Sequence, residues 1–142
     1  MKIIILSDSN SIHTLRWVDA LKKKGINIVL FSFFIPKKVN KNKYRKLGVK
    51  VISPNLRPKI NNLRSLNLSK ISYLLSINML NSLINNFKPD IIHAHYASSY
   101  GVVALLTKFK PFIVSVWGSD LYEFPNNGIF LRSIFKKVIK SA

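Results

Sequence analysis

Short apolar runs alternate along the chain with longer stretches in which apolar residues recur every three or four positions. Five of the short runs are rich in Ile, Val and Phe and contain four to seven residues, which is typical of buried strands. These runs comprise residues 2–6, 27–33, 49–52, 90–94 and 112–116. Strands that alternate with helices predict a parallel sheet that is covered on both faces.

The helical stretches lie between these predicted strands. The first spans residues 12–24 and is closed by Gly25, with Trp17 on its inner face and Arg16 on its outer face. Further helices are expected near residue 41 and over residues 68–87, 99–108 and 128–140. Right-handed connections then give a doubly wound, Rossmann-like α/β sheet with strand order 3-2-1-4-5 and helices on both faces.

This topology predicts where a ligand would bind. In doubly wound sheets, ligands lie at the carboxyl ends of the strands, near the point where the strand order reverses, here between strands 1 and 4. The loops that reach this point are residues 7–13, 93–99 and 117–124. The unusual polar residues of the sequence lie in these loops, so we expect the functional site where the three loops meet.

The first of these loops, SDSNSIH, offers polar side chains and contains no glycine. Ser9, Asn10 and Ser11 precede the predicted helix, where such residues commonly cap the free N–H groups. The same N–H groups favour an anion, and His13 and Arg16, three residues apart, share one helix face. The loop is therefore either a structural cap or a site for a phosphate or a sugar hydroxyl. The chain contains neither G-x-G-x-x-G nor G-x-x-x-x-G-K-[ST], which argues against dinucleotide binding and against a P-loop.

The second loop lies in the sequence DIIHAHYASSYG, residues 90–101, which contains two of the three histidines. We expect His93 and His95 to point to opposite faces of the strand, so that they would not share a metal ion. No carboxylate lies near enough in the sequence to complete a facial triad, and we predict neither a metal nor another cofactor. His93 fits a buried, hydrogen-bonded structural role, whereas His95 and Tyr96, at the end of the strand, are the better site candidates.

The third loop, SVWGSDLYEFP, combines Trp117, Gly118 and Ser119 with an acidic pair, Asp120 and Glu123. The chain has only five acidic residues, so a carboxylate in this loop is expected to have a specific partner. Asp120 therefore either caps the following turn or takes part in the site.

Composition narrows the classes of function. The chain has 142 residues, of which 48% are hydrophobic, enough for one folded domain, and it has no cysteine. Disulfides, thiolate metal sites and cysteine nucleophiles are thereby excluded. The apolar N-terminal run ends at Leu6, which is too short for a signal peptide. The longest uncharged stretch, residues 71–87, contains seven Ser and Asn residues, which argues against a membrane span.

The net charge of +18 is unevenly distributed along the sequence. No Asp or Glu occurs between Ala20 and Pro89, where 15 of the 23 basic residues lie. This charge favours a phosphorylated substrate, an anionic lipid surface or a nucleic acid, unless it only reflects composition at tolerant surface positions. The last predicted helix carries a basic stripe that either rests on an anionic membrane or belongs to a helix that merely covers the sheet. The stripe consists of Arg132, Lys136 and Lys140.

Three segments together resemble the N-terminal, acceptor-side domain of the family 4 retaining glycosyltransferases, which have the GT-B fold. The segments are MKIIILSDSNSIHTLRWVDALKKKGINIVLFS, KPDIIHAHYASSYGVVALL and FIVSVWGSDLYEFP, in this order along the chain. The resemblance implies that residues 1–142 form a single Rossmann-like N-terminal domain, and that the C-terminal, donor-binding domain is absent from this fragment. The fragment alone would then be inactive.

The resemblance also implies roles for the candidate residues. His95 and Tyr96 match the family's I-H-x-H-Y segment and would line the acceptor side of the cleft. Gly118 and Asp120 match an H-G-x-D segment in which Trp117 stands in place of the family's His. We predict that Asp120 and His95 are catalytic and position the acceptor hydroxyl. The residues predicted to bind the acceptor or the donor phosphates are Ser9, Asn10, Ser11, His13, Arg16, Tyr96, Trp117, Gly118 and Ser119.

The function expected from this resemblance is hexosyl transfer from a nucleotide-sugar co-substrate to a polysaccharide, lipopolysaccharide or glycolipid acceptor. Such an enzyme would be cytoplasmic and peripheral at the inner face of the membrane, in contact with anionic lipid and without a specific nucleic acid. Two alternatives remain: a stand-alone Rossmann-type phosphate- or nucleotide-binding module, and a basic nucleic-acid-binding module. Against the second, aromatic residues are not interleaved with the Lys cluster of residues 37–50 as stacking platforms require.

Overall fold

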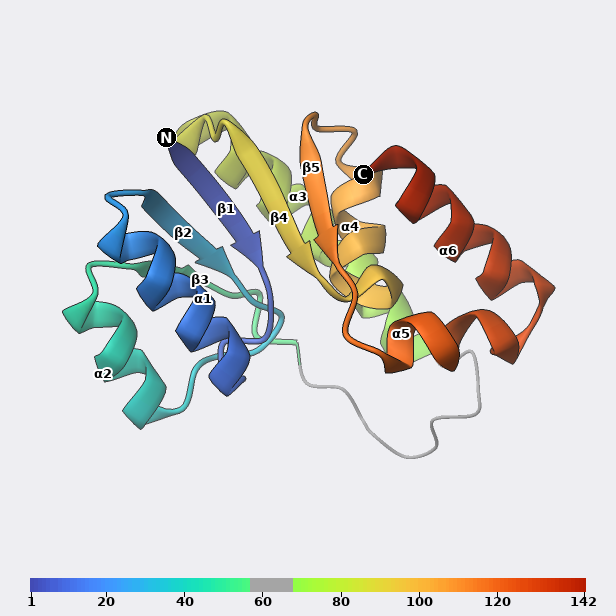
Figure 1. The fold of residues 1–142 in the computed structure, drawn as a ribbon, viewed down its shortest axis with the longest axis horizontal. Coiled ribbons are helices and arrows are strands. Elements are labelled where there is room, and N and C mark those ends of the chain that lie inside the picture. Colours follow the sequence, from blue (N-terminus) through green and yellow to red (C-terminus); the bar gives the residue numbers. More distant parts are fainter. Residues whose placement is uncertain (57–67) are drawn as a thin grey trace.

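The computed structural model describes the backbone of residues 1–56 and 68–142, and the side chains of these residues except 68–75 and 127. Five parallel strands form one sheet in the order β3-β2-β1-β4-β5 (Figure 1). They are β1 (Lys2–Leu6), β2 (Asn27–Phe31), β3 (Lys50–Ile52), β4 (Ile91–His95) and β5 (Phe112–Ser115). The predicted fold class and strand order are confirmed, with strand ends shifted by one or two residues.

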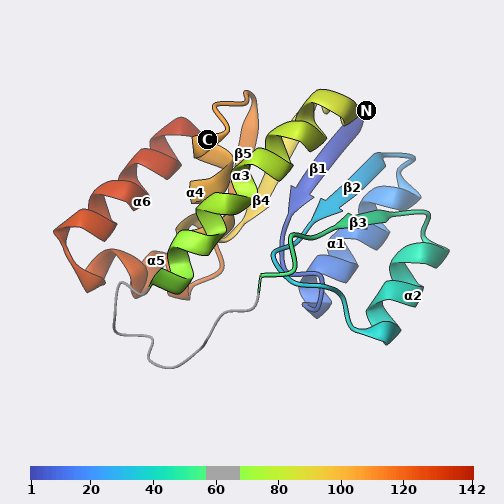
Figure 2. The ribbon, with the colours of Figure 1, turned by 180° about the vertical axis from the view of Figure 1, so that it is seen from behind.

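Helices cover the sheet and extend beyond its β5 edge (Figures 1 and 2). They are α1 (Ile12–Lys23), α2 (Lys38–Lys46), α3 (Leu68–Phe87), α4 (Gly101–Leu106), α5 (Ser119–Tyr122) and α6 (Ile129–Ser141). The helix expected over residues 99–108 instead begins as a π-helix, η1 (Tyr96–Tyr100), that runs directly into α4. The short helix α5 and the 3-10 turn η2 (Phe124–Asn127) were not predicted, because neither is long enough to produce a helical pattern.

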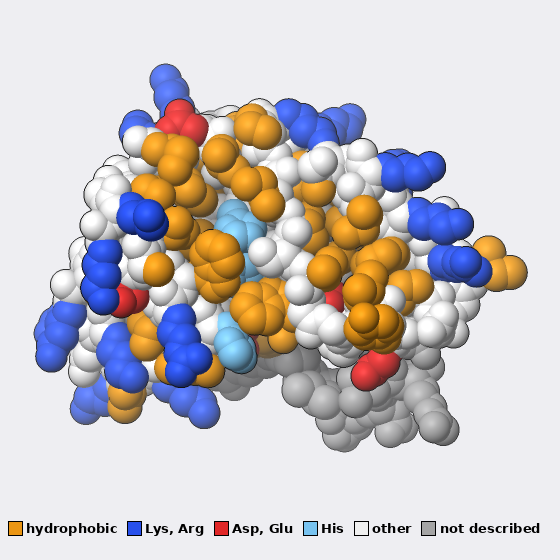
Figure 3. All heavy atoms as spheres, viewed as in Figure 1, with side chains coloured by type: hydrophobic (Ala, Val, Ile, Leu, Met, Phe, Trp, Pro, Cys, Tyr) orange, Lys and Arg blue, Asp and Glu red, His pale blue; other side chains and the backbone are white. Residues whose placement is uncertain are grey.

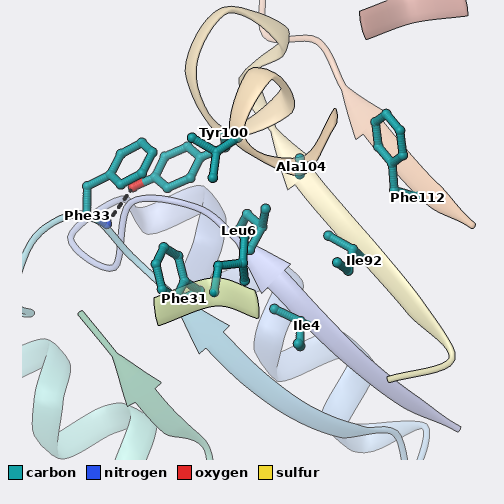
Figure 4. Close-up of a cluster of buried hydrophobic side chains, with 11 residues drawn as sticks. Ile4, Leu6, Phe31, Phe33, Ile92, Tyr100, Ala104 and Phe112 are labelled. Atoms are coloured by element: carbon teal, nitrogen blue, oxygen red, sulfur yellow. Dashed lines mark hydrogen bonds between the residues drawn. The ribbon is translucent and has the colours of Figure 1, made fainter. Parts of the chain in front are cut away.

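Alternate residues of the strands build a core on each face of the sheet. On one face, Ile4 and Leu6 pack with residues of α3 and α4 (Figure 4), and the Tyr100 ring stacks on the Phe33 ring at a centroid distance of 4.1 Å. On the other face, Ile3 and Ile5 belong to a second core, which packs against α1 and α2. The period of two along each strand thus explains why both faces of the sheet are apolar.

The second face is less completely covered at the β5 edge. Ile113 of β5 pairs with His93 in register, so both side chains lie on the face that α1 covers. Ile113 is nevertheless 49% exposed. No helix in the described parts of the chain combines the length and hydropathy needed to cross a bilayer.

Candidate functional site

A short chain of hydrogen bonds joins the carboxyl ends of β1 and β4. The Ser7 hydroxyl, directly after β1, lies 2.9 Å from Nδ1 of His95 and 2.6 Å from the Thr14 hydroxyl of α1. All three side chains are buried. The strand order predicts this meeting point, because β1 and β4 are neighbours at the reversal of the sheet.

His95 is the most enclosed ionisable group of this site. Its side chain is 1% exposed, and its Nε2 atom is buried without a hydrogen-bond partner among the described residues. Burial, and to a lesser extent the charge of His93, lowers the pKa of His95 to about 4. The imidazole is therefore neutral near pH 7, where a neutral ring can accept a proton or donate a hydrogen bond.

The expectation that His93 and His95 point to opposite faces of the strand is wrong. Their ring centroids are only 4.8 Å apart, because residues two apart in a strand share a face. Nε2 of His93 lies 2.8 Å from the Ser115 hydroxyl, and burial lowers the pKa of His93. The structural, hydrogen-bonded role expected for His93 is thus confirmed. Among the side chains that the structure describes, no three His, Asp or Glu residues are grouped so as to hold a metal ion.

Two tryptophan rings contact the two imidazoles, one from α1 and one from the loop after β5. The Trp17 ring of α1 contacts His93 edge-on at a centroid distance of 5.1 Å. The Trp117 ring lies 5.0 Å from His13, 5.4 Å from His95 and 6.3 Å from Tyr96. Figure 3 shows the histidines as a strip near the middle of this face, bordered by apolar side chains. We call His13, His95, Tyr96 and Trp117 the ring cluster.

The position of Trp17 differs in part from the prediction. The residue faces the sheet and contacts both His93 and His95, but its side chain is 39% exposed because the face beside it is only partly covered. Its role beside the imidazoles was missed, as were the contacts of Ser7, Thr14 and Ser115. The helical spacing of His13 and Trp17, four residues apart, is the sequence signal that puts both rings on the same side of α1.

Asp120 joins the second and third loops through its two carboxylate oxygens. One carboxylate oxygen accepts the backbone N–H of Trp117, the other accepts that of Ala97, and both distances are 2.7 Å. The side chain is only 2% exposed. This geometry differs from the cap of the following turn that was one of the two alternatives, because Asp120 lies inside α5, whose N-cap is Gly118 and has no side-chain hydrogen bond. A direct contact of Asp120 with an acceptor stays a prediction.

The turns on either side of Asp120 have unusual backbone geometry. Gly118 has φ +93°, a conformation that glycine adopts readily and other residues rarely do. Tyr96 has φ +72° although it carries a bulky side chain, and it begins the π-helix η1. Left-handed residues and π-helical turns recur at functional sites, where the surrounding structure holds them in place.

The polar side chains of the first loop form hydrogen bonds with other parts of the protein or with the start of α1. Ser9 is fully buried, and its hydroxyl donates to the Phe34 carbonyl at 3.0 Å. The Asn10 side chain bonds to the backbone of the loop after β2, accepting the Lys37 N–H at 2.7 Å. Ser11 caps α1 by accepting the His13 N–H at 3.2 Å.

Ten of the eleven predicted site residues fall into three groups, and the eleventh, Gly118, forms the left-handed turn before α5. The ring cluster brings four of them together. Ser9, Asn10, Ser11 and Asp120 have hydrogen bonds that fix the loops. Arg16 and Ser119 are exposed.

A doubly wound sheet with histidines and aromatic rings at the carboxyl ends of β1, β4 and β5 defines a Rossmann-like ligand-binding domain. The sequence matches the glycosyl transferase 4-like family over residues 2–142, so the chain belongs to that family. No curated protein matches the chain.

Solved structures of similar fold include glycosyltransferases. MurG of Acinetobacter baumannii has 12% identity and a TM-score of 0.59, and the match covers 96% of this chain and 39% of MurG. For the spinosyn rhamnosyltransferase SpnG, solved with thymidine diphosphate, the identity is 13% and the TM-score 0.58, over 94% of this chain and 41% of SpnG. The zinc-inhibited form of teicoplanin deacetylase Orf2 has 10% identity and a TM-score of 0.57, over 96% of this chain and 84% of Orf2. These likenesses concern the fold, and the chain spans about two fifths of the two transferases.

Proposed function

We propose that this chain is the acceptor-binding domain of a retaining glycosyltransferase that uses a nucleotide-sugar donor. The acceptor is a glycan or a lipid-linked glycan, as in the assembly of polysaccharide, lipopolysaccharide or glycolipid. The observation that carries the proposal is the ring cluster, assembled at the ligand edge of the sheet in a chain of this family. The donor is held mainly by a second domain.

The ring cluster suits a sugar ligand for physical reasons. Aromatic faces bind the apolar C–H faces of a sugar, and Trp117 and Tyr96 supply two such rings beside an imidazole. The indole Nε1 of Trp117 and Nε2 of His95 are both buried without a partner among the described residues. A sugar hydroxyl can bond to either nitrogen once the Trp117 ring shifts, and Gly118 beside it gives the loop the backbone freedom to move.

Retaining transfer breaks the bond between the anomeric carbon and the donor diphosphate and forms a glycosidic bond of the same configuration. The departing diphosphate needs positive charge, and the acceptor hydroxyl must be held close to the anomeric carbon. In the proposal, Arg16 and the N-terminal end of α1 face the phosphates. Neutral His95 accepts a hydrogen bond from the acceptor hydroxyl, while Asp120 holds the loops of Trp117 and Ala97 in position. No step in this scheme uses a metal ion.

The decisive experiment uses the complete enzyme that contains this domain. Release of nucleoside diphosphate is measured with a panel of UDP-, GDP- and dTDP-sugars and oligosaccharide acceptors, and NMR of the product reports the anomeric configuration. Trp117→Ala should raise the acceptor KM about tenfold, the effect of one lost aromatic contact, while the donor KM stays within a factor of two.

Trp117→Phe is the matched control, because it keeps an aromatic face and should raise the acceptor KM less than threefold. Inversion at the anomeric carbon would contradict the retaining mechanism. Nucleotide binding without transfer to any acceptor would favour a stand-alone nucleotide-binding module. Salt-dependent binding to both RNA and DNA, again without transfer, would favour a nucleic-acid-binding protein.

A further inference from the structure

The first turn of α6 exposes two large apolar side chains. Ile129 is 90% exposed and Phe130 is 68% exposed, whereas Val138 on the same helix is fully buried. The later turns of α6 pack on the body of the protein, where Val138 approaches Gly101 of α4. Figure 3 shows apolar side chains that project from the surface at the end of the molecule where α6 begins in Figure 1. We call Ile129 and Phe130 the apolar tip.

Basic side chains continue from the apolar tip along α6. Arg132, Lys136 and Lys140 are spaced by four residues and are all exposed, so they form a stripe on one side of the helix. The stripe covers nine residues, and its first and last members are eight steps, or about 12 Å, apart along the helix. Figure 3 shows a row of basic side chains along the edge of the molecule that ends beside the projecting apolar group. No acidic residue occurs between Phe124 and Ala142.

An exposed apolar tip beside a row of cations has the chemistry of a surface that binds an anionic bilayer. Large apolar side chains enter the boundary between headgroups and acyl chains, while Lys and Arg bind the lipid phosphates. We propose that α6 docks this protein on anionic membranes, with Ile129 and Phe130 inserted and the basic stripe on the headgroups. A stable protein interface buries about 800 Å² on each side, which the two side chains of the tip do not supply by themselves.

The helix α2 is the rival surface within the same chain. It is also basic, and Val39 there is 64% exposed. It has no exposed aromatic side chain, because its only aromatic residue, Tyr44, is 1% exposed. A ring at the tip favours α6, since aromatic residues are preferred at the bilayer interface. The two helices lie at opposite ends of the sheet (Figure 1), so variants of each can be compared directly.

Docking through α6 would have a consequence for the ring cluster. The chain passes from Trp117 through α5 and η2 into α6, so the apolar tip and the ring cluster are joined by one short connection. Docking at the tip would place the membrane on the side of the domain from which this connection leads to the ring cluster, where a lipid-linked acceptor would bind. This consequence rests on the proposed function, whereas the docking itself does not.

The first test measures insertion with a fluorophore. Since the chain has no cysteine, Ile129→Cys can be labelled at one position with the environment-sensitive dye NBD, and Val39→Cys on α2 is the matched control. With vesicles of phosphatidylglycerol and phosphatidylcholine at low salt, the NBD emission at residue 129 should rise severalfold and shift to the blue, while the control changes little. Insertion of the control label alone, or no response at residue 129, would overturn the proposal.

The second test measures vesicle sedimentation after charge removal. Replacing Arg132, Lys136 and Lys140 by Gln should weaken binding on the order of 100-fold, as expected for three cations near a lipid surface. Replacing Lys38, Lys43 and Lys46 of α2 by Gln removes the same charge and should weaken binding less than tenfold. Equal losses would assign binding to net charge alone and overturn the proposal.

A third variant separates lipid from a second copy of the chain. Ile129→Ser with Phe130→Ser should weaken vesicle binding by roughly tenfold or more, because two apolar side chains no longer leave water. It should leave the circular dichroism spectrum and the molar mass in solution unchanged. A parent dimer that this variant converts to a monomer would show that the tip binds another copy, against the proposal. All these readouts are independent of sugar transfer.

Discussion

The Ser7 hydroxyl lies between the Thr14 hydroxyl, at 2.6 Å, and Nδ1 of His95, at 2.9 Å. Ser7 has one proton to donate, so it cannot donate to both neighbours. If Ser7 donates to Thr14, then Nδ1 of His95 carries the proton and Nε2 is an acceptor. If Ser7 donates to His95, then Nε2 carries the proton and becomes a donor. The hydrogen bond between Ser7 and Thr14 therefore influences which hydrogen bond His95 offers to a ligand.

Thr14→Val removes one member of this chain while keeping the shape of the side chain. Ser7 then has only His95 as its partner, so we expect the Nε2-protonated tautomer of His95 to increase. The hydroxyl of Thr14→Ser should restore the parental tautomer ratio. Nitrogen-15 NMR of the imidazoles measures the ratio directly. An unchanged ratio in Thr14→Val would mean that Ser7 already donates to His95 in the parent protein.

Stability should depend on pH through His95. Because burial lowers its pKa from 6.5 to about 4, the unfolded chain binds a proton between these values that the folded protein does not bind. The stabilising effect is complete above pH 6.5 and is lost as the pH falls, by up to about 3 kcal/mol at pH 4. Burial lowers the pKa of His93 as well, which acts in the same direction.

Urea unfolding at pH 7.0, 6.0 and 5.0 measures this dependence. His95→Gln cannot titrate, so its free energy of unfolding should change less over this range than that of the parent. NMR titration of the His95 ring should show no protonation at pH 5.5 in the folded protein. Parallel curves for the parent and His95→Gln would contradict the assignment.

Asp120 should contribute to stability through both of its oxygens. Asp120→Ala leaves the buried N–H group of Ala97 and the partly buried N–H group of Trp117 without their acceptor, at a cost of about 3 kcal/mol in total. Asp120→Asn keeps the shape but turns an NH₂ group toward one of the two N–H donors, so it should cost about half as much. Asp19→Asn is the control, because the Asp19 pair with Lys23 is exposed and contributes less than about 1 kcal/mol.

Urea unfolding ranks these variants, and NMR reports the Trp117 and Ala97 amide shifts. If Asp120→Asn were as stable as the parent but inactive in sugar transfer, the carboxylate would act on substrate and not on the loops. A loss of stability that accompanies displaced amide signals would instead identify Asp120 as a positioning residue.

The fold could be predicted from the sequence because its signals are local and repeated. Apolar runs and helical spacing located all five strands and the order 3-2-1-4-5, and Gly25, with φ +75°, follows α1 as expected. The edges of elements were less well predicted, since hydrogen bonds between neighbouring strands decide where each strand ends. The π-helix at Tyr96 depends on its packing against other elements and has no sequence period of its own.

The candidate site could be located but not assembled from the sequence. The topology brings the loops of His95 and Trp117 to the same sheet edge, and that prediction needs no side-chain detail. The bond from Asp120 to the Ala97 N–H joins residues 23 positions apart and depends on how two loops turn. The error on His93 had a different source, because the period of two already places residues 93 and 95 on one face.

Gly101, the first residue of α4, provides a test of how tightly α4 is held against α6. A Cβ at this position would lie 3.0 Å from Cγ1 of Val138 and 3.2 Å from the Tyr96 carbonyl oxygen. Gly101→Ala should therefore cost about 2 kcal/mol through overpacking, even though Ala favours a helix by about 1 kcal/mol. Removing the Val138 methyl groups relieves the closer of the two contacts. The double variant Gly101→Ala, Val138→Ala should thus be more stable than the sum of the single effects predicts, by about 1 kcal/mol.

Gly25→Ala is the matched control for this comparison of single and double variants. Its φ of +75° is unfavourable for Ala, but no atom lies within 4 Å of the added Cβ, so its effect should simply add to that of Val138→Ala. Urea unfolding of the single and double variants gives both coupling energies. Additive effects for Gly101 and Val138 would mean that α4 and α6 move apart at little cost. The left-handed conformation of Tyr96 would then have to be maintained by Asp120 and the Trp117 loop, which hold the other side of the same turn.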